Sequence, residues 1–313
     1  MNFKNLITRA LSGAVFVLVM VAGTMYHPLT YLLVMCVVLA GALGEYLKIT
    51  AAMRGVKHRR WPVILISLVL FLISFQLNRP PVGALPGDAD LLDTMWYLFA
   101  MQRDKNLDLT VLLPCVFFLL IGIQIFRIAD NPFQHIGYSF LGIMWVCVPL
   151  MLTNHLYFDT DAGPVFVVTL FALIWLHDTA CYLTGSLIGR HKLLERISPG
   201  KTIEGTAGGF VLTPLAGYFV NDLYRFFGAS ELFSAGVWVV IAVVVSATAT
   251  VGDLAESMLK RKFQIKDSGS FMPGHGGFLD RFDAYFFTVP FVTLLLWILR
   301  QSENVGALID FVK

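Results

Sequence analysis

Long apolar runs recur along the whole chain, and they constrain its fold more than any other feature. Hydrophobic residues make up 57% of the 313 residues and charged residues only 14%, a composition that soluble domains do not normally have. A run of about 20 apolar residues is long enough for a helix to cross a bilayer. The runs predict nine membrane-spanning helices near 10–26, 29–47, 61–77, 109–126, 137–153, 165–188, 205–221, 236–252 and 284–299. The expected fold is therefore an all-α polytopic membrane protein.

The basic residues are distributed unevenly among the segments that join these spans. With the N-terminus on the cytoplasmic side, the inner segments hold most of the 23 Lys and Arg residues, which fits the positive-inside rule. The polar segments 189–204 and 253–283 both belong to this inner set. We therefore expect a multi-pass protein of the cell inner (cytoplasmic) membrane whose active site faces the cytoplasm.

The chain is expected to have two regions. Residues 1–135 predict N-terminal transmembrane helices, and residues 136–313 predict a C-terminal transmembrane catalytic region that contains both polar inner segments. The long outer segment 78–108 is acidic and broken by prolines. We interpret it as a connector with a short interfacial helix near 91–101.

Carboxylates gather at the inner ends of the C-terminal spans. Asp178 lies inside an apolar run, in HDTACY, where a charged group is costly and is by default a functional candidate. The alternative is a structural hydrogen bond to a neighbouring helix. Asp253 shares a helical face with Glu256, and Asp280 and Asp283 are likewise three residues apart at the start of the last helix.

If these two helices meet, Asp253, Asp280 and Asp283 converge at one depth. Carboxylates so close together repel one another unless a cation neutralises them. Oxygen ligands suit a hard cation such as Mg²⁺, whose shell is usually completed by water and substrate phosphates. The sequence therefore predicts a magnesium site, with a solvated charged face as the alternative.

Basic residues are interleaved with these acids in the same two inner segments: Lys201, Lys260, Arg261, Lys266 and Arg281. Such cations beside a bound metal are what a phosphate site needs, although positive-inside charge alone explains some of them. The segment SPGKTIEG is not a P-loop, because Glu195 stands where that motif requires its first glycine. It can still present backbone N–H groups and Lys201 to an anion at a helix start.

The stretch PGHGGFLDRFD, residues 273–283, directly precedes the last apolar run. Its glycines, Gly276 and Gly277 among them, would let the backbone approach a ligand closely. For His275 two interpretations stay open, a hydrogen bond within the loop and a catalytic proton transfer.

The run SMLKRKFQIKDSGSFMPGHGGFLDRFD, residues 257–283, closely resembles the signature of the phosphatidate cytidylyltransferases of the bacterial type, also called CDP-diacylglycerol synthases. The shared pattern is Ser, two residues, Lys-Arg, four residues, Lys-Asp, and later His-Gly-Gly and Asp-Arg-x-Asp. HDTACY and SPGKTIEG are similar to two further stretches of that family. The resemblance covers residues 175–283, whereas the N-terminal half agrees only in hydropathy.

The resemblance implies a nucleotidyltransferase that makes CDP-diacylglycerol and pyrophosphate from CTP and the phosphatidate of the inner leaflet, for phospholipid biosynthesis. It implies Mg²⁺, with a second cation and a homodimer as further expectations, and no nucleic acid partner. Asp253 and Asp280 are the expected metal ligands, and Asp283 supports them. The residues expected to act on the substrates are Asp178, Lys201, Lys260, Arg261, Lys266, Asp267, His275 and Arg281, and those expected to bind the nucleotide are Ser198, Gly276 and Gly277.

Two other functions fit parts of the pattern. A membrane kinase that uses CTP or ATP on a polyprenol or phytol-like alcohol would need a base for the hydroxyl, and His275 and Asp267 are the candidates. A secondary transporter would predict internal repeats and interrupted helices facing the midplane, and no repeat is evident in the sequence.

Overall fold

The computed structural model describes residues 3–51, 60–78, 109–125, 131–159, 162–226, 230–271 and 276–312. Two of the predictions, the interfacial helix near 91–101 and the roles of His275, lie outside the described residues.

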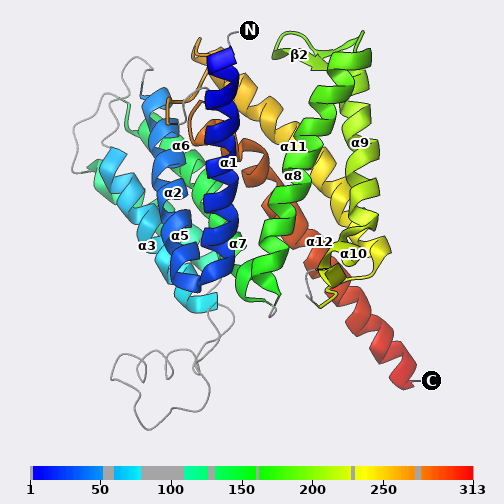
Figure 1. Cartoon of the computed structure of the whole chain (residues 1–313). Helices are drawn as coiled ribbons and strands as arrows, with labels where there is room; N and C mark the ends of the chain where they lie inside the picture. Colours follow the sequence, from blue (N-terminus) through cyan, green and yellow to red (C-terminus); the bar gives the residue numbers. More distant parts are fainter. Residues whose placement is uncertain are drawn as a thin grey trace.

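The described residues are almost entirely helical (Figure 1). The helices are α1 (Phe3–Tyr26), α2 (Pro28–Thr50), α3 (Arg60–Asn78), α5 (Leu109–Ile125), α6 (Pro132–Gly142), the π-helical η1 (Ile143–Cys147), α7 (Val148–Phe158), α8 (Gly163–Ile188), α9 (Ile203–Tyr218), α10 (Val220–Phe226), α11 (Ala235–Lys262) and α12 (Leu279–Val312). Six helical stretches are long and apolar enough to cross a membrane: α2, α3, the continuous α6–η1–α7, α8, α11 and α12 as far as Gln301. Each predicted run coincides with a helix, but nine crossings stay a prediction, because the described apolar parts of α1 and α5 and the 16-residue α9 are shorter.

Helix α11 continues past the predicted end of its apolar run at residue 252. Ser234 caps its start, and the helix then runs through Asp253 to Lys262. Its polar residues repeat at helical spacing, and basic side chains occupy the last turn, where they interact favourably with the helix dipole. Consequently the acids and cations of this stretch lie on a helix and not in a loop.

A β-hairpin departs from the all-α prediction. Strands β1 (Lys192–Leu194) and β2 (Ser198–Thr202) pair antiparallel within the segment that joins α8 to α9. Thr202 then caps α9, because its hydroxyl accepts a hydrogen bond from the Gly205 N–H at 3.1 Å. The strands are too short to give a periodic hydropathy signal, so the sequence pattern did not reveal them.

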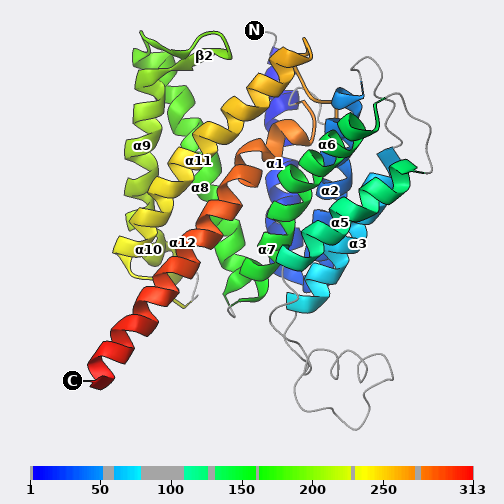
Figure 2. The ribbon, with the colours of Figure 1, turned by 180° about the vertical axis from the view of Figure 1, so that it is seen from behind.

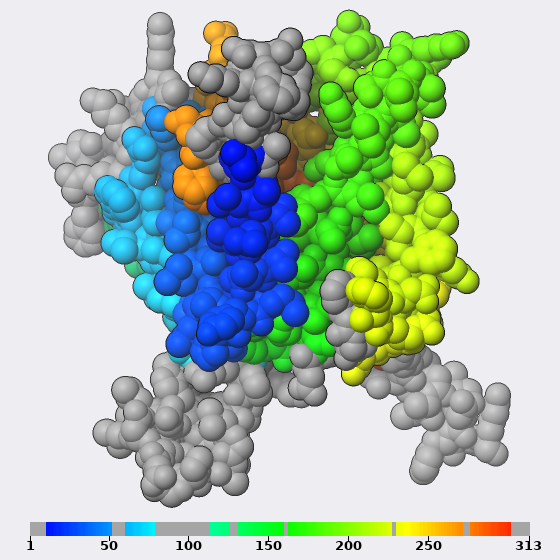
Figure 3. All heavy atoms as spheres, in the orientation of Figure 1, coloured from blue at the N-terminus to red at the C-terminus, as the bar shows by residue number. Residues whose placement is uncertain are grey.

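Helices α8, α9, α11 and α12 pack together on one side of the bundle, and α2, α3, α6 and α7 pack on the other (Figures 1 and 2). Helix α1 lies between the two groups, against α2 and α8. Phe171 of α8 stacks on Tyr285 of α12 with ring centroids 4.1 Å apart, which fixes the start of α12 beside α8. The hairpin and the end of α2 lie at the same end of the molecule, where Figure 3 shows a hollow beside α8.

Candidate active site

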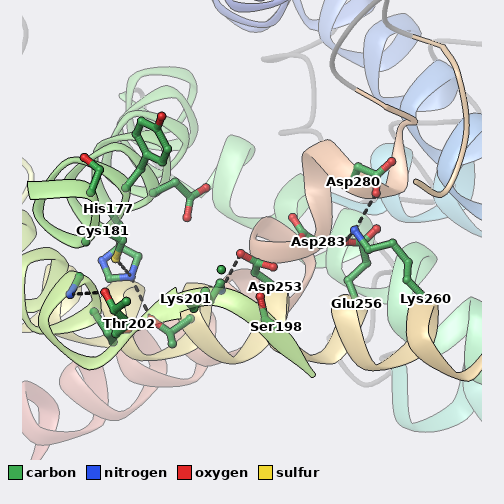
Figure 4. A pocket seen from close by; sticks show the side chains of 18 of the residues that line it. His177, Cys181, Ser198, Lys201, Thr202, Asp253, Glu256, Lys260, Asp280 and Asp283 are labelled. Carbon is green, nitrogen blue, oxygen red and sulfur yellow. Dashed lines mark hydrogen bonds and ion pairs between the residues drawn. The ribbon is translucent and has the colours of Figure 1, made fainter. Parts of the chain in front are cut away.

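A cavity of about 590 Å³ lies at the hairpin end of the bundle, between α8, β2, α9, α11 and the start of α12 (Figure 4). Its volume is in the range of small-molecule sites. The predicted site residues on its wall are Asp178, Ser198, Lys201, Asp253, Lys260, Asp267, Asp280, Arg281 and Asp283. Tyr182 of α8 also lines the cavity and is 74% exposed, so the cavity is open to the molecular surface at this residue.

Three carboxylates form a cluster on one side of the cavity. Oxygens of Asp253, Glu256 and Asp283 all lie within 4.8 Å of one another. Glu256 and Asp283 are buried, with exposed fractions of 1% and 9%. Gly252 permits this arrangement, because a Cβ there would press on the backbone of Asp283 and Ala284. The close crossing of α11 and α12 thus brings the acids together.

The cluster fits a hard cation. Three carboxylates in such close contact are strongly repulsive unless a positive charge neutralises them. Among the described atoms, Glu256 Oε1 is a buried oxygen with no hydrogen-bond partner, which a native structure rarely leaves without a ligand or water. Carboxylate oxygens at this spacing are the donor set that Mg²⁺ takes.

Asp280 occupies a different position from the three clustered acids. Its Oδ1 accepts a hydrogen bond from Lys260 Nζ at 2.9 Å. Its Oδ2 accepts from the Gly277 N–H at 2.7 Å and from the Ser268 N–H at 2.9 Å. Lys260 Nζ also lies 2.5 Å from Glu256 Oε2, so this lysine joins Asp280 to the cluster.

The hairpin supplies the facing wall of the cavity. Lys201 of β2 extends its Nζ to 2.5 Å from Asp253 Oδ2, and Ser198 lies at the start of the same strand. Asp178 of α8 faces the same space. The hairpin therefore brings a cation directly to the carboxylate cluster.

Several predicted site residues lie away from the cavity wall. Arg261 donates from Nε to the Ile197 carbonyl at 3.2 Å and so ties α11 to the hairpin. Lys266 is exposed and does not line the cavity. Gly276, with φ of +83°, and Gly277 pack against carboxylates of neighbouring side chains and do not form part of the wall.

Glu204 holds the base of the hairpin. Its carboxylate accepts hydrogen bonds from the backbone N–H groups of Arg190, at 3.0 Å, and His191, at 3.1 Å, and contacts His191 Nδ1 at 2.6 Å. These bonds, with that from Arg190 contributing most, lower the pKa of Glu204 to about 2. The hairpin is thus fixed by a charged group at neutral pH.

Two acidic residues were not assigned to the site from the sequence. Glu256 was placed on the face of Asp253 but given no role, although its spacing was a usable signal. Glu45 lies inside the apolar run of α2, and a charge in such a run is itself a functional signal. In the structure its carboxylate reaches Ser268 and the start of α12.

The fold and the site together define a class: a multi-pass membrane protein with a pocket of carboxylates and cations at one end of its bundle. Residues 7–299 match the Cytidylyltransferase family, and the chain therefore belongs to that family. It is 33% identical over 240 residues to a phosphatidate cytidylyltransferase of Staphylococcus haemolyticus (strain JCSC1435), which covers 74% of this chain and 87% of that protein. A protein of the same name from Staphylococcus aureus (strain COL) is 38% identical over 169 residues, 52% of this chain and 60% of that protein. The family resemblance predicted from the sequence is confirmed.

Proposed function

We propose that this protein transfers the cytidylyl group of CTP to phosphatidate and so makes CDP-diacylglycerol and pyrophosphate for phospholipid biosynthesis. The observation that carries the proposal is the convergence of Lys201 and Lys260 on the carboxylates of one pocket. The family and the names of the relatives support the same reaction. They favour neither the alcohol kinase nor the transporter.

The carboxylates of the pocket would hold a divalent cation, and Mg²⁺ is the expected one. Asp253, Glu256 and Asp283 would be its ligands. Asp280, which the sequence predicted as a ligand, would instead hold Lys260 beside the cluster. A bound cation of this kind neutralises phosphate charge and orients the phosphates for displacement. A second cation remains an expectation.

The reaction needs no strong base. A phosphate oxygen of phosphatidate forms a bond to the α-phosphorus of CTP, and the bond from that phosphorus to the bridging oxygen breaks, releasing pyrophosphate. Phosphatidate is already largely anionic at neutral pH, so catalysis consists mostly of positioning and charge neutralisation. Lys201, Lys260 and Arg281 would bind the phosphates of the two substrates, and Asp178 and Asp267 would help to order the pocket.

We place this pocket at the cytoplasmic face of the inner membrane, in reach of CTP and of phosphatidate in the inner leaflet. The distribution of Lys and Arg supports this orientation. Cysteines introduced near Gly200 and Ser268 should be labelled only from the cytoplasmic side. Labelling of either from outside would contradict the orientation.

The position of the transferred label tests the reaction. Purified protein receives phosphatidate and CTP labelled at either the α- or the γ-phosphorus. We expect the α-label in the lipid and release of pyrophosphate, and also the reverse formation of CTP from pyrophosphate and CDP-diacylglycerol. Transfer of the γ-label to the lipid would show a kinase and would overturn the proposal.

A further inference from the structure

Glu45 of α2 reaches across the bundle to the connection between α11 and α12. Its Oε2 accepts a hydrogen bond from the Ser268 hydroxyl at 2.8 Å and from the Leu279 N–H at 2.9 Å. No ion pair involves Glu45 in the part of the chain that the structure describes. A carboxylate in an apolar run is costly, so these two hydrogen bonds account for its place.

The contact with Leu279 caps helix α12 from outside. Leu279 is the first residue of that helix, where N–H groups have no partner within the helix and the dipole favours a negative charge. The next residue is Asp280. Glu45 therefore fixes the turn of helix that carries the pocket acids Asp280 and Asp283.

The contact with Ser268 leads directly into the pocket. Ser268 Oγ lies 2.9 Å from Asp280 Oδ2, and the Ser268 N–H also donates to that oxygen. Asp280 in turn binds Lys260, which binds Glu256. A chain of hydrogen bonds and ion pairs thus runs from Glu45 on α2 to the carboxylate cluster.

Two glycines of the connection leave room for the Glu45 carboxylate. A Cβ at Gly269 or at Gly277 would collide with it, and in both cases the three nearest atoms all belong to Glu45. These glycines are therefore explained by the approach of a side chain from α2.

We propose that Glu45 is a positioning residue for the reaction: it holds Ser268 and the start of α12 so that Asp280 and Lys260 keep their places in the pocket. The role of Glu45 in turnover rests on the proposed function. The N-terminal half, which lies outside the signature run of residues 257–283, thereby contributes to the geometry of the site.

The first test compares Glu45→Ala and Glu45→Gln with Glu231→Ala, an exposed glutamate outside the pocket. Removal of a group that orients the ligands of a metal site typically costs about 10–100-fold. We expect Glu45→Ala to lose that factor in kcat with little change in the KM for CTP, and Glu45→Gln, which keeps one acceptor oxygen, to lose less. Glu231→Ala should match the wild type. A Glu45→Ala enzyme with wild-type kcat would overturn the proposal.

A double-variant comparison separates positioning from general destabilisation. If Glu45 acts through Ser268, the loss in Glu45→Ala with Ser268→Ala should be no greater than in the worse single variant, because residues that act as a unit are not additive. Gly277→Ala should reduce kcat in the wild type and in Glu45→Gln, but only slightly in Glu45→Ala, where the colliding carboxylate is gone. Losses that multiply in both comparisons would overturn the proposal.

A readout independent of activity keeps the two proposals apart. Hydrogen exchange of peptides that cover residues 264–282 should be faster in Glu45→Ala than in the wild type and unchanged in Glu231→Ala. If the wild type makes no CDP-diacylglycerol, the proposed function fails, and the exchange rates still decide whether Glu45 holds this segment. Unchanged exchange in Glu45→Ala would contradict its positioning role.

Discussion

The two walls of the pocket are built in opposite ways. The helix wall, Asp253, Glu256, Lys260, Asp280 and Asp283 on α11 and α12, places its charges in a largely buried setting, with 1% exposure at Glu256 and 9% at Asp283. The hairpin wall, residues 190–204, is largely exposed, and it is held by hydrogen bonds to Glu204 and from Arg261.

The difference in burial indicates that the two walls have different roles. Buried charges are costly unless they are paired. Lys260 offsets part of the acidic charge of the helix wall through Glu256 and Asp280, and the geometry of that wall is set when the helices pack. The desolvation cost of the hairpin wall is small, because its cations remain in contact with water. We infer that the helix wall provides the cation site and that the hairpin wall contributes Lys201 to the phosphates of the nucleotide.

The most severe change is expected from the helix wall. Asp253→Asn removes a carboxylate from the cluster and should lower kcat by about 10²–10³-fold, since the phosphate charge is then poorly neutralised. CDP-diacylglycerol formation at saturating Mg²⁺ measures the effect. Asp222→Asn, which changes an exposed acid paired with Arg225 outside the pocket, is the matched control. More than about a tenth of wild-type turnover in Asp253→Asn would rule that residue out as a ligand.

Loss of Lys260, the cation that Glu256 and Asp280 share, should lower the stability of the fold as well as turnover. Lys260→Met leaves Glu256 and Asp280 without their shared partner, and breaking a buried pair in this way costs about 3–5 kcal/mol. Chemical unfolding in detergent should therefore show a clearly lower midpoint. Lys262→Met, which changes an exposed lysine of the same helix end, should leave the midpoint near that of the wild type. Equal midpoints for the two variants would mean that Lys260 does not stabilise the helix wall.

A smaller effect, on binding and not on folding, is expected from the hairpin wall. The Lys201–Asp253 pair is partly exposed, at 26% and 34%, so Lys201→Ala should change stability by less than about 1 kcal/mol. Its KM for CTP should rise about tenfold, as loss of one charge-assisted hydrogen bond predicts. A large drop in stability of Lys201→Ala with an unchanged KM for CTP would contradict a binding role for the hairpin wall.

The smallest effect concerns pH and the base of the hairpin. The pKa of Glu204 falls from its ordinary value of 4.5 to about 2, so its contribution is complete above pH 4.5 and is lost as pH falls towards 2. A nitroxide attached to Glu195→Cys should gain mobility over that interval when Glu204 is unchanged. In Glu204→Gln it should be mobile at every pH. If the electron paramagnetic resonance spectrum does not change with pH when Glu204 is present, Glu204 does not hold the hairpin.

Much of the helical framework could be predicted from the sequence, because long apolar runs leave the chain few alternatives in a bilayer. Spacing at two helix ends predicted that Asp253, Asp280 and Asp283 converge if the helices meet. The structure brings Asp253 and Asp283 together with Glu256 and places Asp280 beside Lys260. The hairpin gave no hydropathy signal, and the bridge from Lys260 to Asp280 depends on how two helices cross.

Glu45 illustrates the limit most clearly. Its charge in an apolar run is an unusual feature to which the sequence analysis gave no role, and its partners lie 223 and 234 residues further along the chain. No local pattern records which of the later segments such a side chain will meet. The same long-range contact gives a structural meaning to Gly269 and Gly277 that spacing alone could not supply.

The exposure of Tyr182 on the cavity rim has a consequence for how this enzyme would be measured. A pocket that is open at Tyr182 can receive one reactant from the lipid bilayer and the other from bulk water. The lipid would then be counted as a mole fraction of the bilayer and the nucleotide as a molarity. Diluting the vesicles in buffer would leave the first quantity unchanged, whereas adding inert phospholipid would lower it and slow turnover.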